Sequence, residues 1–205
     1  MKFVSHLDLQ RTLQRAFRRA KLETLFSQGF NPHLKMSYTP PLPLFATSDE
    51  EYLDIELTGR QSAMEVYDSL SGVLPRGIIV NSVKQLFAEA KPLSSLFTKA
   101  AYEIRFSDIA DAKQSAKELN SFFASAEEMP VTRLNKKRNE KTTDIKKQIY
   151  SFEATADGDD VLIEALIGCS NDDLLNPFVL TSFLSENVPI LSDCGIKKVH
   201  KLYVE

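Results

Sequence analysis

An amphipathic helix near the start of the sequence is the feature that most constrains how this chain folds. Ser5, followed three residues later by Asp8, is a capping-box pattern: the serine oxygen accepts a backbone N–H, and the carboxylate suits the positive end of the helix dipole. Apolar residues then recur at spacings of three and four, namely Leu9, Leu13, Ala16, Phe17 and Ala20. The pattern predicts a helix over 7–20 that buries this stripe and ends near Lys21.

A row of arginines lies beside the apolar stripe of this helix. Arg11, Arg15 and Arg18 are spaced i, i+4, i+7 along one side, and such a row can follow a phosphate backbone. A solvated helix face is the alternative. Over residues 5–35 only Asp8 and Glu23 oppose the positive charges, so salt bridges within the helix do not account for the row.

A turn rich in hydrogen-bonding side chains follows an expected strand over 22–27. Gly29 permits a positive φ, Pro32 fixes its own φ, and a residue that precedes proline is held extended. Turns of this kind on a rigid scaffold often carry binding residues. The candidates for phosphate contact are Gln28, Gly29, Asn31 and Lys35. The alternative is a self-satisfied Asx turn that exposes His33.

The order of periodic segments indicates the fold class. Strand patterns over 1–4, 22–27, 51–57 and 78–86, with helices over 7–20 and after the second capping box at Ser62 and Glu65, give a β-α-β-β-α-β order, and a further strand can begin at 35–38. A similar order with an added hairpin repeats from residue 102. We predict an α+β protein of two tandem ferredoxin-like (βαββαβ) units, with antiparallel sheets and helices on one face. The expected bounds are 1–90 for the first unit, 91–100 for a linker and 101–205 for the second unit.

Positive charge is concentrated in two segments of a chain whose formal net charge is −3. Residues 1–36 carry seven Lys and Arg against two Asp and Glu, and residues 131–147 again carry seven against two. Lys136, Lys137 and Arg138 form a cluster in the second segment. This distribution favours a local polyanion site over bulk attraction to nucleic acid.

Several classes of protein are excluded or disfavoured. No apolar run approaches 18 residues, so no membrane span is expected, and residues 1–4 lack the apolar region of a signal peptide. The two cysteines form no C-x-x-C pattern, which disfavours a zinc or iron–sulfur site. Neither G-x-x-x-x-G-K-[ST] nor G-x-G-x-x-G occurs. We expect a cytoplasmic protein without a metal or cofactor.

Acid–base chemistry has few candidate residues. His6 or His33 would serve as a general acid or base in a metal-independent reaction on RNA. Residues 51–57 alternate as a half-buried strand, and Asp54 and Glu56 lie on its polar face, where paired carboxylates can also act. A solvated strand face is the more common reason for such a pair.

Four segments carry a family resemblance: SHLDLQRTLQRAFRRA, SQGFNPHLKMSY, PLPL and EYLDIEL, with VHKLYV at the end. With these the sequence resembles the radical-SAM-linked domain family, bacterial proteins fused to or encoded near a radical SAM protein. The resemblance implies candidate site positions at His6, Asp8, Arg11, Gln28, Gly29, Asn31, His33, Lys35 and Asp54, and a radical SAM protein as a partner. The chain has no C-x-x-x-C-x-x-C, so it cannot itself hold the radical SAM cluster.

The leading hypothesis is an RNA-binding companion of a radical SAM protein, with tRNA or rRNA as the expected target. A basic cleft would contact phosphates, and Phe30, Tyr38 or Tyr52 would stack a base. A metal-independent RNA-processing enzyme that uses His6 and His33 is one alternative. A protein–protein adaptor for a radical SAM partner is the other. The sequence leaves open whether the protein is an enzyme.

Overall fold

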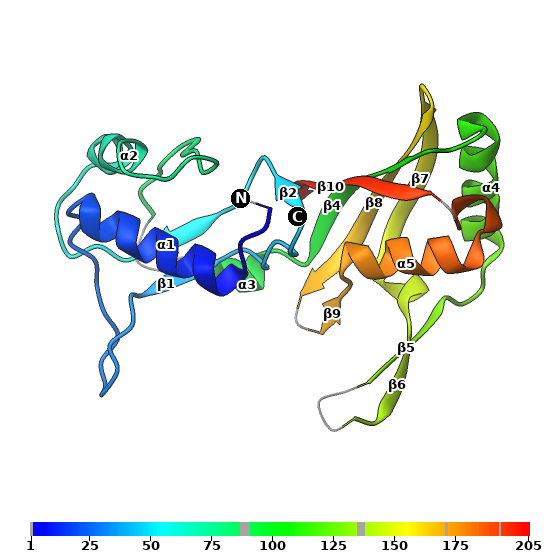
Figure 1. The fold of residues 1–205 in the computed structure, drawn as a ribbon. Helices are drawn as coiled ribbons and strands as arrows, with labels where there is room; N and C mark the ends of the chain where they lie inside the picture. The colour runs from blue at the N-terminus through cyan, green and yellow to red at the C-terminus, as the bar shows by residue number, and fades with distance from the viewer. Residues whose placement is uncertain (1, 87–90, 135–137, 171, 193) are drawn as a thin grey trace. The chain divides into compact units, whose positions relative to one another are not determined.

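The computed structural model describes residues 2–86, 91–134, 138–170, 172–192 and 194–205, and the chain forms two compact units (Figure 1). Unit 1 comprises Met1–Phe45 and Glu51–Leu96, and unit 2 comprises Ala46–Glu50 and Phe97–Glu205. The division after Leu96 falls within the predicted linker. The sequence pattern places 46–50 in the first unit, whereas the structure joins this segment to unit 2.

Unit 1 packs two helices against a small sheet. Its elements are α1 (His6–Arg19), β1 (Met36–Tyr38), β3 (Leu53–Ile55), α2 (Ala63–Ser71) and α3 (Leu93–Leu96). Phe17 from α1 and Val66 and Leu70 from α2 form its buried apolar cluster. β1 and β3 pair antiparallel, and the facing residues Met36 and Ile55 pack against that cluster. Both helices therefore cover the same face of the sheet.

The predicted helix boundaries are confirmed in unit 1. The Ser5 hydroxyl accepts a hydrogen bond from the backbone N–H of Asp8 at 3.2 Å, and Ser62 and Glu65 form the reciprocal capping box that begins α2. α1 ends where Lys21 adopts a left-handed φ of 55°. The local signals for starting and stopping a helix are thus sufficient at these positions.

A ring of three backbone hydrogen bonds joins the extended segments of unit 1. The N–H of Leu25 donates to the carbonyl of Glu56 at 2.8 Å, the N–H of Glu56 donates to Lys35 at 3.2 Å, and the N–H of Lys35 donates to Leu25 at 2.9 Å. Beyond this junction Phe26 pairs with Leu34 in an isolated bridge. Residues between 26 and 34 therefore form a narrow hairpin, seen as the blue loop between α1 and β1 in Figure 1.

Two predicted strands of the first unit are wrong, and a third, over 22–27, forms only isolated bridges at Thr24 and Phe26. Residues 2 and 3 form a turn, and residues 78–86 are irregular. Val80 and Val83 from the second segment pack against the apolar cluster without pairing in a ladder, while Ile79 is exposed. Packing of partly buried apolar side chains, without strand pairing, thus accounts for the strand-like composition of residues 78–86. Because unit 1 lacks these outer strands, the prediction of two tandem ferredoxin-like units is not confirmed.

Unit 2 is built around a mixed sheet with the strand order β2-β10-β4-β8-β7, and β9 pairs with β8. Its elements are β2 (Thr47–Ser48), β4 (Lys99–Ser107), α4 (Ala112–Ser125), β5 (Pro130–Leu134), β6 (Glu140–Asp144), η1 (Ile145–Gln148), β7 (Ile149–Asp157), β8 (Asp160–Ser170), β9 (Asp173–Leu174), α5 (Pro177–Asn187), η2 (Pro189–Leu191) and β10 (Gly195–Val204). β4, α4, β7, β8, α5 and β10 follow the predicted β-α-β-β-α-β order, and their strands pair antiparallel. β5 and β6 form the additional hairpin.

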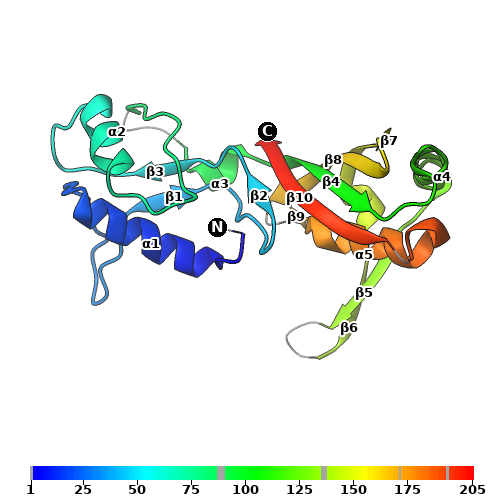
Figure 2. The ribbon, with the colours of Figure 1, turned by 45° about the horizontal axis from the view of Figure 1, so that its top comes forward.

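The core of unit 2 lies between this sheet and its two long helices (Figure 2). Ile104 and Ile163 face each other across β4 and β8, and both are fully buried. Leu119 from α4 and Leu184 from α5 are also fully buried. Within the part of the chain that the structure describes, no helix has the length and apolar character needed to cross a bilayer.

Candidate functional site

The arginine row of α1 is exposed, but its members differ in their contacts. Arg11 forms an ion pair with Asp8 at 3.3 Å, and Arg15 donates a hydrogen bond to the Thr12 hydroxyl at 3.3 Å. No ion pair joins Arg18 to another described residue. The hydrogen bond from Ser5, with Arg11 beside it, lowers the pKa of Asp8. Asp8 therefore remains ionised and offsets the first arginine, so Arg15 and Arg18 keep most of the uncompensated charge.

The tip of the unit 1 hairpin gathers four of the predicted binding residues. Gln28, Gly29, Asn31 and His33 are all exposed there. Gly29 has a φ of 137°, which is the conformation that the turn prediction requires of glycine. The N–H of Ser27 donates to the carbonyl of His33 at 2.7 Å, and the Ser27 hydroxyl accepts the N–H of His33 at 2.9 Å, so the hairpin is closed while the side chains at its tip face solvent.

Phe30 at this tip is the best placed of the three predicted stacking residues. Its side chain is fully exposed. Tyr38 instead packs its ring against the His6 ring at 5.6 Å, and burial raises the pKa of Tyr38 to about 12. Tyr52 is 40% exposed. Phe30 therefore presents an aromatic face that no other ring in the described residues covers.

Lys35 and Asp54 lie on the face of the small sheet opposite the helices. The Lys35 ammonium forms an ion pair with Glu56 at 3.2 Å, so its charge is already compensated within the strand pair. Asp54 faces Ser37 across β1 and β3, and burial raises the pKa of this carboxyl. The Ser37 hydroxyl in turn accepts the backbone N–H of Leu93 at the start of α3.

The three candidate acid–base residues do not meet. The Nε2 atom of His6 lies 2.8 Å from Nε2 of Gln10, and its ring contacts Tyr38 on the helix side of the sheet. His33 lies at the tip of the unit 1 hairpin, where its side chain is exposed. Asp54 lies on the other face of the sheet. The structure therefore gives no general acid–base pair from this set.

The basic segment of unit 2 forms an exposed hairpin. Arg133 on β5 and Lys141 on β6 occupy directly opposite positions, while the hydroxyls of Thr132 and Thr142 bond at 2.8 Å on the other face. Neither Arg133 nor Lys141 forms an ion pair with a residue that the structure describes. Two like charges in such a pair destabilise the ladder. Arg138, with a φ of 60°, is exposed near the hairpin end. Lys136 and Lys137 lie outside the described residues.

The base of this hairpin is firmly attached to unit 2. Asp144 accepts backbone N–H bonds from Met129 at 2.8 Å and from Lys146 at 3.1 Å, and the bond from Met129 is the main cause that lowers the pKa of Asp144. Met129 and Ile145 are both buried at this point. The two cations on the hairpin are consequently held at a defined position relative to the sheet of unit 2.

Two other lysines of the segment serve the fold instead. Lys146 donates a hydrogen bond to the carbonyl of Phe123, its Nζ atom lies 3.2 Å from the centre of that ring, and burial lowers its pKa. Lys147 pairs with Asp144 at 3.3 Å. Among the described cations of 131–147, only Arg133, Arg138 and Lys141 therefore remain available to an external anion.

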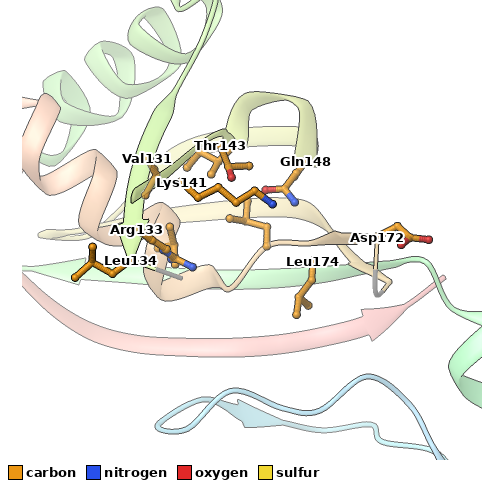
Figure 3. A pocket seen from close by; sticks show the side chains of 11 residues that line it. Val131, Arg133, Leu134, Lys141, Thr143, Gln148, Asp172 and Leu174 are labelled. Carbon is orange, nitrogen blue, oxygen red and sulfur yellow. The ribbon is translucent and has the colours of Figure 1, made fainter. Parts of the chain in front are cut away.

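A pocket of about 310 Å³ lies between this hairpin, β9 and the start of α5 (Figure 3). Its polar lining consists of Arg133, Lys141, Thr143, Gln148 and Asp172. In Figure 3 the Lys141 side chain extends towards Gln148, and the carboxylate of Asp172 is directed away from both cations at the other end of the pocket. The remainder of the lining is apolar.

The sequence indicates the basic segment but not the pocket. Its walls come from three regions, at 131–148, 172–175 and 179, which the fold of unit 2 brings together. The sequence gives little indication that Arg133 pairs with Lys141, because residues 140–144 are all polar or charged and lack the apolar alternation of a strand. Their strand conformation becomes evident only from their pairing with β5 in the structure.

Comparison with known proteins places the chain in a family. A solved structure titled "Crystal Structure of a Cbf5-Nop10-Gar1 Complex" is similar with a TM-score of 0.46 and 11% sequence identity, over 96% of this chain and 45% of that chain. The chain thus spans less than half the length of that protein. No curated protein matches. Residues 1–177 match the family described as "Uncharacterized protein conserved in bacteria (DUF2344)", and the chain belongs to this conserved bacterial family.

Proposed function

We propose that this protein binds RNA, with tRNA or rRNA as its target, and contacts phosphates through the β5–β6 hairpin of unit 2. The observation that carries the proposal is the Arg133–Lys141 pair, two cations in directly opposite positions with no ion-pair partner among the described residues. Such a pair is unfavourable in the free protein, and a bound phosphate relieves the repulsion. Lys and Arg contacts to phosphate supply most of the affinity in non-specific RNA binding.

Unit 1 adds two features that suit the same ligand. Arg15 and Arg18 lie exposed on one side of α1, where they can follow a phosphate backbone. Phe30 offers a ring for base stacking at the hairpin tip, and exposed Gln28 and Asn31 beside it can bond base edges. Single-stranded RNA is recognised by this combination of stacked bases and contacted phosphates.

The salt dependence of binding tests this proposal. We expect a fluorescently labelled single-stranded RNA to bind at low salt, with log K falling linearly against log salt by about 0.7 for each phosphate contacted. The double variant Arg133→Gln/Lys141→Gln should bind more weakly and with a shallower slope. The variant Lys113→Gln/Lys117→Gln removes the same charge from exposed positions on α4 and is the matched control. No binding at low salt, or equal slopes in both variants, rejects the proposal.

A second candidate function, an adaptor for a radical SAM protein, has one observation in its favour. The rings of Phe3 and Phe45 pack edge to face at 5.9 Å in unit 1 while remaining 72% and 55% exposed, and Leu7 and Leu44 are exposed as well. Exposed apolar groups of this kind mark protein contacts. Co-purification with the radical SAM protein from the native host, compared between the natural chain and Phe3→Ser/Phe45→Ser, tests it. Unchanged recovery of the partner argues against the adaptor.

A further inference from the structure

The unit 2 pocket has the size and lining of a small-ligand site. Its volume of about 310 Å³ lies at the lower end of the range of about 300–1,000 Å³ that such sites occupy. Val131, Leu174 and Val179 provide apolar wall, and Arg133, Lys141 and Gln148 provide the polar groups. A site of this size accommodates a single nucleotide, whereas an RNA strand that crosses the surface needs an open groove.

The charge of the pocket matches a terminal phosphate. A phosphomonoester carries about −1.5 to −2 charges at pH 7, whereas each internal phosphate of a nucleic acid carries one. Arg133 and Lys141 supply two positive charges from positions whose Cβ atoms lie about 4.5–5.5 Å apart in an antiparallel pair. The two cations therefore balance a monoester, because the Asp172 carboxylate, the other charged group of the lining, is directed away from both of them.

The other walls suit the rest of a nucleotide. Leu175 and Val179 lie on either side of the first residue of α5 and add apolar wall to the pocket. Leu174 is 60% exposed and forms an apolar wall beside the opening, where a ribose or base can pack. Gln148 has one amide donor group and one acceptor for a base edge.

We infer that the unit 2 pocket binds the phosphorylated end of an RNA, with the terminal phosphate between Arg133 and Lys141 and the attached nucleoside against Leu174 and Val179. The inference rests on the proposed function, because it names the part of an RNA that this hairpin recognises. The ligand chemistry is a nucleoside monophosphate unit, which a 5′-phosphorylated end, a 3′-phosphorylated end or a free mononucleotide each provide.

The test compares one short RNA in three forms: 5′-phosphorylated, 3′-phosphorylated and unphosphorylated. We expect one phosphorylated form to bind about tenfold tighter or more than the unphosphorylated form, since the terminal phosphate adds charged hydrogen bonds to Arg133 and Lys141. The preference should disappear in Arg133→Gln/Lys141→Gln and persist in Lys113→Gln/Lys117→Gln. The preference for the phosphorylated form should also weaken below about pH 6, where the dianionic monoester takes up a proton and becomes a monoanion.

A second variant tests the pocket independently, in case Arg133→Gln/Lys141→Gln fails to fold. Leu174 is exposed, so Leu174→Glu leaves the core intact and adds a negative charge beside the pocket. It should weaken the phosphorylated form about tenfold while leaving the unphosphorylated form unchanged. Equal affinity for all three RNAs overturns the inference and leaves RNA binding intact. Binding of adenosine 5′-monophosphate but not adenosine, with no RNA bound, supports the pocket and rejects the RNA function.

Discussion

The hydroxyl of Thr47 lies 2.8 Å from Nδ1 of His200, and the Asp49 carboxylate lies 3.1 Å from Nε2 of the same ring. His200 is buried, and its side chain is 8% exposed. Both ring nitrogens thus bond to the segment 46–50, which forms β2 at the edge of the unit 2 sheet, parallel to β10. Residues 45 and 51, on either side of this segment, belong to unit 1. His200 therefore fixes a crossing of the chain between the two units.

Replacement of His200 by Ala should detach β2. We expect the free energy of unfolding to fall by about 1–3 kcal/mol, because the change removes a buried hydrogen-bonding group and leaves the Thr47 hydroxyl without its partner. Amide hydrogen exchange across 46–50 should accelerate as well. His33→Ala is the matched control, since that side chain is exposed at the hairpin tip. Equal stability of the two variants contradicts this role for His200.

Asp160 should make the stability of unit 2 depend on acid pH. Hydrogen bonds from Lys197 at 2.9 Å and from Arg105 at 3.2 Å lower the pKa of this carboxyl. Its folded pKa lies below its unfolded pKa of about 3.9, so the stabilisation is complete above about pH 4 and is lost as the pH falls through the folded value. Urea midpoints should therefore fall on acidification, and fall less steeply in Asp160→Asn. Asp159→Asn, in the adjoining turn, should follow the natural chain; an unchanged profile in Asp160→Asn counts against the linkage.

Gly168 lies where β8 meets β9, and no larger residue fits there. A Cβ at this position would lie 2.0 Å from the carbonyl oxygen of Asp173. Gly168→Ala should consequently lower the free energy of unfolding by about 1–3 kcal/mol through displacement of β9. At Gly72, with an ordinary φ of −77°, the nearest atom to such a Cβ is 3.8 Å away. Gly72→Ala should leave stability unchanged or raise it by up to about 1 kcal/mol, and the reverse order of the two variants contradicts the packing.

Features with local causes could be predicted from the sequence. The first helix depends on Ser5, its apolar stripe and the stop at Lys21, all within one segment, and the structure contains each of them. The last helix begins at Pro177 after the cap Asn176, as expected for proline in the first turn. Periodicity and capping are sufficient at these positions because the interactions that decide them span only a few residues.

Features that depend on distant residues could not be predicted. The ion pair between Lys35 and Glu56 joins residues 21 positions apart and offsets the charge of a residue predicted to contact phosphate. The pairing of Thr47 with His200 spans 153 positions. No periodic pattern marks either one, because each depends on strand register that tertiary packing decides. The same is true of His6 and Asp54, two candidate acid–base residues that lie on opposite faces of the small sheet.

The arginines of α1 should separate into binding and structural residues. Arg15→Gln/Arg18→Gln should weaken RNA binding and reduce the salt slope by roughly one for each arginine, with stability unchanged. Arg19 instead donates to the backbone carbonyl of Val73 at 2.9 Å, which links α1 to the end of α2. Arg19→Gln should lower the unfolding free energy by about 0.5–1.5 kcal/mol. Binding isotherms over a salt series measure the RNA affinity, and urea titrations measure the free energy of unfolding. If all three arginine positions change affinity and stability alike, the distinction between binding and structural arginines is wrong.

Phe30 should contribute to RNA affinity through its ring and contribute nothing to folding. Its side chain is fully exposed, so Phe30→Leu and Phe30→Tyr should both unfold at the same urea concentration as the natural chain. Stacking of a base on an aromatic ring contributes about 1–3 kcal/mol, so Phe30→Leu should weaken single-stranded RNA binding about five-fold or more, whereas Phe30→Tyr should retain it. Binding isotherms at one fixed salt concentration measure this contribution of base stacking, which does not depend on charge, separately from the contacts of Arg15 and Arg18 with phosphates. Equal losses in the two variants would mean that the shape of phenylalanine matters rather than its aromatic face, and no loss in either would place the bound RNA away from the hairpin tip.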